Sequence, residues 1–115
     1  MHELPVTQEI IRLSCEEANK LQAKHIKEIV LVIGDLSGFL DDSIQFYFDT
    51  LTSDTLAEGS SLKITRLPML VRCYNCQCEF CPKEDMLNWE CPECHKWNVE
   101  VIQGKEFYID SIEVE

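Results

Sequence analysis

Apolar residues along the chain recur at spacings that predict helices and strands in alternation. Residues 5–22 are predicted to form a helix, with Pro5 in the first turn, where its missing N–H costs nothing. The side chains expected on its buried face recur at helical spacing: Val6, Ile10, Leu13, Ala18 and Leu21. Residues 26–33 are dense in β-branched side chains and end at Gly34, which predicts a buried strand.

The same reading predicts a second helix and a second strand. Residues 43–56 carry an apolar helical stripe, and Asp41 or Asp42 is expected to cap this helix. Residues 62–66 alternate as a strand that ends before Pro68. Close to the end of the chain, 98–103 and 106–115 are strand-like halves around Gly104 and Lys105, which predicts a hairpin.

Composition and charge narrow the class of protein. The chain has 115 residues, which suits one compact domain with a small appended module. Its longest apolar run, 29–33, is far too short to span a membrane, and no basic and apolar leader is visible, so we expect a cytosolic protein. The net charge of −11 disfavours nucleic acid as a partner, because nucleic-acid binding relies on basic side chains.

Paired cysteines form the strongest chemical motif. Six of the seven cysteines lie between 73 and 94, and in a reducing compartment paired spacing indicates metal rather than disulfides. Cys73 and Cys76 form one pair and Cys91 and Cys94 another, with 14 residues between the pairs. Two such pairs predict a tetrahedral zinc site, which is structural rather than catalytic because four thiolates leave no open position.

A third pair leaves the ligand set open. Cys78 and Cys81 are surplus to a four-thiolate site and are interpreted as free thiols, a swap-in ligand set, or a second soft-metal or redox site. His95 is either a neighbour of the ligands or an alternative ligand. Iron–sulfur ligation is also open to thiolates.

The order of elements predicts an α+β fold in which two helices lie on a small three-stranded mixed sheet and a zinc-ribbon-like module is inserted. We expect the main domain at 1–70 plus 98–115 and the zinc module at 71–97. No catalytic constellation or phosphate loop occurs, so an enzyme is not expected.

The chain resembles the HypA/HybF family of hydrogenase-maturation nickel proteins over its whole length. The matching residues are Met1-His2-Glu3, the segments VLVIGDLSG and FDTLTSDTLAEGSSLKI, and the cysteines Cys73, Cys76, Cys91 and Cys94. Cys78 and Cys81 depart from the family pattern.

The resemblance implies a nickel metallochaperone that binds Ni(II) at its N-terminus, through His2 with Met1 and Glu3 contributing. It also implies delivery to the large subunit of [NiFe]-hydrogenase beside a HypB-type GTPase, with urease as a further recipient for some relatives. The donors are consistent with this, since a free α-amine, a deprotonated backbone amide and the His2 imidazole form fused chelate rings, and Ni(II) accepts square-planar nitrogen sets. A homodimer is compatible with the sequence.

Two other functions compete with this interpretation. The first is a zinc-ribbon adaptor that binds only proteins and has an inert, frayed N-terminus. The second is a redox switch that uses Cys78 and Cys81.

Overall fold

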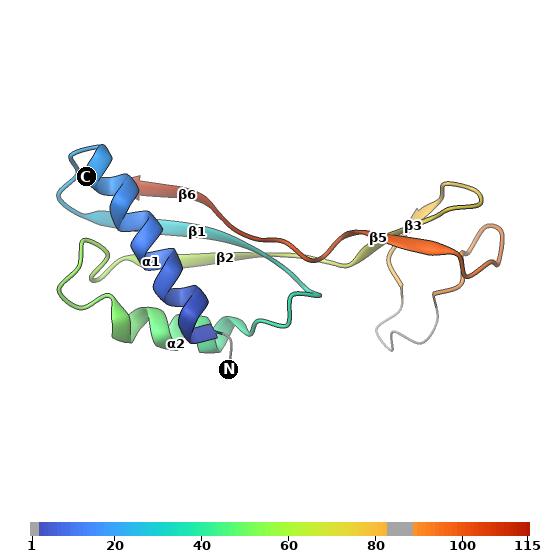
Figure 1. Ribbon diagram of the computed structural model, residues 1–115, viewed down its shortest axis with the longest axis horizontal. Helices are drawn as coiled ribbons and strands as arrows, with labels where there is room; N and C mark the ends of the chain where they lie inside the picture. The colour runs from blue at the N-terminus through green and yellow to red at the C-terminus, as the bar shows by residue number, and fades with distance from the viewer. Residues whose placement is uncertain (1–2, 83–88) are drawn as a thin grey trace.

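The computed structural model describes residues 3–82 and 89–115 as an elongated molecule with one β-sheet near each end (Figure 1). Its principal extents are 55 × 27 × 17 Å. No helix within these two ranges is long and apolar enough to cross a membrane. The elements in chain order are α1 (Glu3–Lys20), β1 (Ile26–Gly34), α2 (Asp41–Leu51), β2 (Ser61–Leu67), β3 (Leu70–Cys73), β4 (Glu79–Phe80), β5 (Val99–Gln103) and β6 (Phe107–Val114).

The first sheet has the order β2-β1-β6, with β1 parallel to β2 and antiparallel to β6. Helix α1 packs against β1, β6 and α2, and α2 also packs against β2. The predicted α+β architecture, with two helices on a three-stranded mixed sheet, is therefore confirmed. Its buried core combines side chains of α1, β1 and α2 with the turn before β2, and partly buried side chains of β2 and β6 pack against it. The buried core residues are Ile10, Ile11, Ala18, Ile26, Ile29, Leu31, Ile33, Ile44, Phe48 and Ala57.

Helix α1 differs from its prediction in boundaries and in its buried face. It ends at Lys20, where Gln22 adopts a positive φ of 55° and Ala23 N–H bonds back to the Ala18 carbonyl at 2.9 Å, as in a Schellman cap. Leu13 is 41% and Leu21 57% exposed, so placing them on the buried face is wrong. The residues that α1 buries are Glu3, Thr7, Ile10, Ile11, Ser14 and Ala18.

Helix α2 begins without the predicted aspartate cap. Leu40 is the N-cap residue and makes no side-chain cap hydrogen bond. Asp41 and Asp42 lie in the first turn, where their negative charge still interacts favourably with the helix dipole. The helix ends at Leu51 because the Thr52 and Thr55 hydroxyls bond to nearby carbonyls and turn the chain before β2.

The second sheet has the order β4-β3-β5, with β3 antiparallel to both neighbours. Strand β5 therefore pairs with β3, and β6 pairs with β1, so the predicted hairpin around Gly104 and Lys105 is wrong. The chain instead passes from one sheet to the other at this point, as Figure 1 shows. The second sheet extends on both sides of the predicted module at 71–97.

The two connections between the sheets meet at Gly34, the last residue of β1. Gly34 N–H bonds to the Glu106 carbonyl at 2.8 Å, and Gly34 pairs with Leu67 in the ladder. The Gly104 backbone approaches Gly34 so closely that a Cβ there would lie 2.0 Å from the Gly104 carbonyl oxygen. Glycine is therefore required at 34 by the space available.

Candidate metal centres

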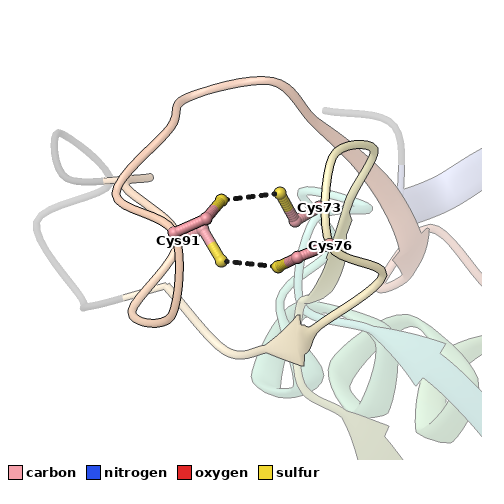
Figure 2. Close-up of side chains that lie close together, drawn as sticks. Cys73, Cys76 and Cys91 are labelled. Carbon is pink, nitrogen blue, oxygen red and sulfur yellow. Dashed lines mark hydrogen bonds between the residues drawn. The ribbon is translucent and has the colours of Figure 1, made fainter.

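Four cysteine sulfurs converge beyond the end of β3. The Sγ atoms of Cys73, Cys76, Cys91 and Cys94 all lie within 4.8 Å of one another. Figure 2 shows the thiols of Cys73, Cys76 and Cys91 turned toward a common centre. Cys76 Sγ lies 3.4 Å from Cys91 Sγ. Zn–S bonds of about 2.3 Å in a tetrahedron place sulfurs roughly 3.8 Å apart, so the spacing and the donor chemistry both fit zinc.

The first cysteine pair sits on a turn closed by backbone hydrogen bonds. Cys73 is the last residue of β3, and its N–H donates to the Cys78 carbonyl at 2.9 Å. Gln77 N–H donates to the Cys73 carbonyl at 2.9 Å, which Gln77 achieves with a φ of 65°. The turn brings both sulfurs of the pair to one side.

The second pair repeats this turn bond for bond. His95 N–H donates to the Cys91 carbonyl at 2.8 Å, and Cys91 N–H donates to the Lys96 carbonyl at 2.9 Å. His95 has the positive φ, 62°, that Gln77 has in the first turn. Two like turns facing each other give the cluster an approximate two-fold arrangement.

Charge is unevenly distributed among the sulfurs. Burial raises the pKa of the Cys91 thiol, but the backbone N–H groups of Cys94 and Glu93 donate to its sulfur and lower the pKa to about 6. The N–H of Cys78 lowers the pKa of Cys76, but the neighbouring Cys91 sulfur and burial raise it to about 12. At neutral pH the Cys91 thiolate therefore lies beside the protonated Cys76 thiol, and a bound cation would displace the Cys76 proton.

The third cysteine pair stands outside this cluster. Within residues 3–82 and 89–115, the group of metal-binding side chains that can surround one ion contains neither Cys78 nor Cys81. Cys78 contributes its carbonyl to the first turn, the position that Lys96 fills in the second, so the turn itself needs no cysteine there. Cys81 follows β4 and is exposed.

His95 is not part of the four-sulfur group that the described residues form. Its side chain is 69% exposed and its Nδ1 lies 3.0 Å from Glu90 Oε2. The hydrogen bond to Glu90 raises the pKa of His95. In this arrangement the imidazole pairs with a carboxylate rather than with the four sulfurs.

The second predicted centre lies at the start of α1. Met1 and His2 fall outside the described residues, so their predicted role stays a prediction. Glu3 is the first described residue and is only 6% exposed. Its Oε2 accepts the Leu40 N–H at 3.2 Å, which ties the start of α1 to the residue before α2.

Sequence reasoning missed the side chain that holds Leu40 in place. Arg66, on β2, donates to the Phe39 carbonyl and to the carboxylates of Asp35 and Asp41. The available signal was an arginine near the end of the strand SLKITRL, in a chain whose loop before α2 carries Asp35 and leads to Asp41 and Asp42. Its partners are 25 to 31 residues away in the chain, so spacing alone does not connect them.

The fold and the four-sulfur cluster define a small metal-binding protein of two parts, an α+β domain and a zinc-ribbon-like module. The chain belongs to the HypA family: the family model described as "Hydrogenase/urease nickel incorporation, metallochaperone, hypA" matches residues 1–114. The resemblance stated from the sequence is therefore confirmed. By its description the family consists of metallochaperones rather than catalysts.

Relatives and solved structures agree over nearly the whole chain. "Hydrogenase maturation factor HypA" of Dehalococcoides mccartyi is 41% identical over 115 residues, which cover 100% of this chain and 95% of that protein. The protein of the same name from Moorella thermoacetica is 42% identical, with full coverage of both. The solution structure of the Ni metallochaperone HypA from Helicobacter pylori has a TM-score of 0.66 at 31% identity, covering 99% of this chain and 97% of that one. A second solution structure of a HypA protein has a TM-score of 0.75 at 30% identity, covering 100% and 97%.

Proposed function

We propose that the protein carries Ni(II) at its N-terminus, with His2 as the principal ligand and Met1 and Glu3 contributing. Membership of a nickel-incorporation family is the observation that carries this proposal. The α-amine, the second backbone amide and the imidazole would supply nitrogen donors of the kind that Ni(II) accepts in square-planar sites.

The surroundings of Glu3 support a metal site at this end of the molecule. The Glu3 side chain is only 6% exposed, so its carboxylate is held in the folded part of the molecule beside the two proposed N-terminal ligands in the sequence. Its Oε2 accepts the Leu40 N–H at 3.2 Å, and a carboxylate oxygen is also an acceptable ligand for a divalent cation. The start of α1 carries positive dipole charge, which moderates affinity for a cation, and a carrier has to release its cargo.

We propose that Cys73, Cys76, Cys91 and Cys94 hold a structural zinc ion, whose role is to cross-link the module 71–97. Within 71–82 and 89–97, the described part of the module, the buried residues are Val71, Cys73, Pro82 and Cys91. This is a small core, so a metal would supply much of the module's stability. The remaining segments, 1–70 plus 98–115, would form the nickel-binding domain. Cys78 and Cys81 would remain additional thiols.

The partners that we propose are those that fit the class of the protein. We propose delivery of nickel in the cytosol to the large subunit of [NiFe]-hydrogenase, or to urease, with a HypB-type GTPase as accessory protein. A homodimer is compatible with these roles. The acidic surface, with a net charge of −11, suits protein partners and disfavours nucleic acid.

Nickel titration of zinc-loaded protein tests the proposal. Native protein should compete for Ni(II) with a chromogenic chelator, whereas His2→Ala protein and protein with a blocked α-amine should lose the tight site. His25→Ala is the matched control, because its imidazole bonds to the Glu58 carbonyl and the Glu115 carboxylate, far along the chain from the N-terminus.

Undiminished nickel binding in both N-terminal variants would contradict the proposed site. Native protein that binds zinc alone, together with full hydrogenase activity in a His2→Ala strain, would indicate the adaptor function instead. Mass spectrometry should confirm that the first residue is intact, because a fused tag removes the free amine.

A further inference from the structure

A single guanidinium holds the loop that joins β1 to α2. Arg66 Nε donates to Asp35 Oδ1 at 3.0 Å, at the start of the loop. One Arg66 terminal nitrogen donates to Asp41 Oδ1 at 3.0 Å and to the Phe39 carbonyl at 3.1 Å, at the end of the loop. The rigid fork of arginine can bridge these three acceptors at once, whereas a lysine ammonium is a point charge on a flexible stem.

The base of this loop is fixed independently of Arg66. Asp35 N–H bonds to the Leu67 carbonyl at 2.9 Å, and Leu36 N–H bonds to the Gly104 carbonyl at 2.7 Å. The ring of Phe39 packs on Phe107, with the ring centroids 4.7 Å apart. The backbone that depends on Arg66 is therefore the final stretch, from the Phe39 carbonyl to the first turn of α2.

That final stretch presents one N–H to the start of α1. Leu40 is extended, with φ −101° and ψ 129°, and its N–H points to Glu3 Oε2. Within a capping box, a glutamate three residues into a helix binds the N–H of its own N-cap residue. Here Glu3 fills that role for α2 from a different helix, so the position of Leu40 contributes to the orientation of the Glu3 carboxylate.

We infer that Arg66 is a positioning residue for the N-terminal nickel site. Its contacts are with Asp35, Asp41 and the Phe39 carbonyl, and they fix the backbone from Phe39 to Asp41. Leu40 lies within that stretch and in turn helps to orient the Glu3 carboxylate. Groups that hold a metal ligand by hydrogen bonds set its orientation, and their loss usually weakens metal binding at least about tenfold. The inference rests on the proposed function, because it needs nickel to bind at Glu3's end of α1.

Electrostatics alone predicts the opposite sign. Removing a positive charge near a cation site lessens repulsion, and it also leaves Asp35 and Asp41 without their partner, so nickel would bind more tightly. Positioning predicts weaker binding. The direction of the change therefore separates the two effects.

The experiment compares Arg66→Gln with Arg12→Gln in zinc-loaded protein. Arg12 is a matched control because it also bridges two carboxylates, those of Glu9 and Glu16, but it lies on the exposed side of α1. Nickel dissociation constants are measured by chelator competition, and zinc content and the unfolding midpoint are measured for each protein. Arg66→Gln should bind nickel about tenfold more weakly, and Arg12→Gln should bind as native protein does.

A double-mutant cycle with Glu3→Gln tests whether Arg66 acts through Glu3. Once Glu3 is neutralised, Arg66→Gln should weaken binding little further, whereas a general loss of stability would add its full effect. If Arg66→Gln does not fold, Arg66→Lys keeps the charge but not the fork, and it should also weaken nickel binding.

Unchanged or tighter nickel binding in Arg66→Gln, or full additivity with Glu3→Gln, would overturn the positioning role while leaving the N-terminal site intact. Failure of the proposed function has a different signature. Native protein would then lack the tight site, or His2→Ala would retain it.

Discussion

Replacement of Gly34 by alanine should destabilise the protein by about 3 kcal/mol. A Cβ at this position would lie 2.0 Å from the carbonyl oxygen and 2.2 Å from the carbonyl carbon of Gly104. Both are backbone atoms, so no side-chain rotation relieves the clash. The methyl group can be accommodated only if the chain entering from β5 moves away from β1.

The magnitude follows from what that movement breaks. The Gly104 carbonyl has to retreat by about 1 Å to reach the 3.0 Å below which Cβ contacts essentially never occur. It accepts the Leu36 N–H at 2.7 Å, and the neighbouring bond from Gly34 N–H to the Glu106 carbonyl is 2.8 Å. Loss of two hydrogen bonds at about 1 kcal/mol each, with about 1 kcal/mol of overpacking strain, gives the predicted value.

Gly38→Ala is the matched control. Gly38 has a φ of 82°, and a Cβ added there would meet no heavy atom within 4 Å, so alanine costs only backbone strain, about 1 kcal/mol. Urea unfolding of the zinc-loaded proteins, followed by circular dichroism, measures the free energy of unfolding of each. Gly34→Ala protein no less stable than Gly38→Ala protein would refute the steric argument.

Two predictions concern the cysteine cluster. Zinc binding to metal-free protein at pH 7 should release fewer protons than one per thiol, because a pKa of about 6 leaves Cys91 largely ionised beforehand, while Cys76, with a pKa of about 12, still gives up its proton. Proton release should increase as the pH falls below 6. Calorimetry in buffers of different ionisation enthalpy measures the number of protons released. Release of one proton per thiol at pH 7 would contradict the lowered pKa of Cys91. Replacing Cys78 and Cys81 together by serine should leave the zinc content unchanged, whereas Cys91→Ser should lower the zinc content. Loss of zinc from the double variant would instead indicate that Cys78 and Cys81 are ligands.

Local patterns predicted the elements whose cause is local. The apolar run that forms β1 ends at Gly34 as expected, and Ile29, Leu31 and Ile33 are fully buried. On α1, apolarity was a poorer guide to the buried face. Thr7 and Ser14 are buried while Leu13 is exposed, and the Thr7 hydroxyl donates to the Glu3 carbonyl, which satisfies it inside the helix.

Errors arose where distant segments decide the pairing. The two strand-like halves around Gly104 looked like a hairpin because a glycine between alternating runs is its usual signal. Gly104 has a φ of 129°, but the turn-like conformation serves a crossing against Gly34 and Met69 rather than a hairpin. That crossing involves residues about 70 positions apart, and no local pattern encodes it.

The candidate sites show the same difference between local and long-range causes. The four-cysteine group was predictable from spacing, since each pair builds its own turn with a positive φ at Gln77 or His95. The bond between Glu3 and Leu40 joins residues 37 apart and became visible only when the two helix starts were brought together. The dependence of Leu40 on Arg66 was invisible for the same reason.

The crossing at Gly34 also makes the zinc module a replaceable insertion between β2 and β6. Leu67 and Phe107 flank the end of β1 on opposite sides, so the two points where the chain leaves and re-enters the first sheet are about two strand spacings, roughly 10 Å, apart. About three or four extended residues could span that gap. A chain shortened in this way would keep every β2-β1-β6 pairing, which means that the length and content of the module can change without altering the register of the sheet that carries it.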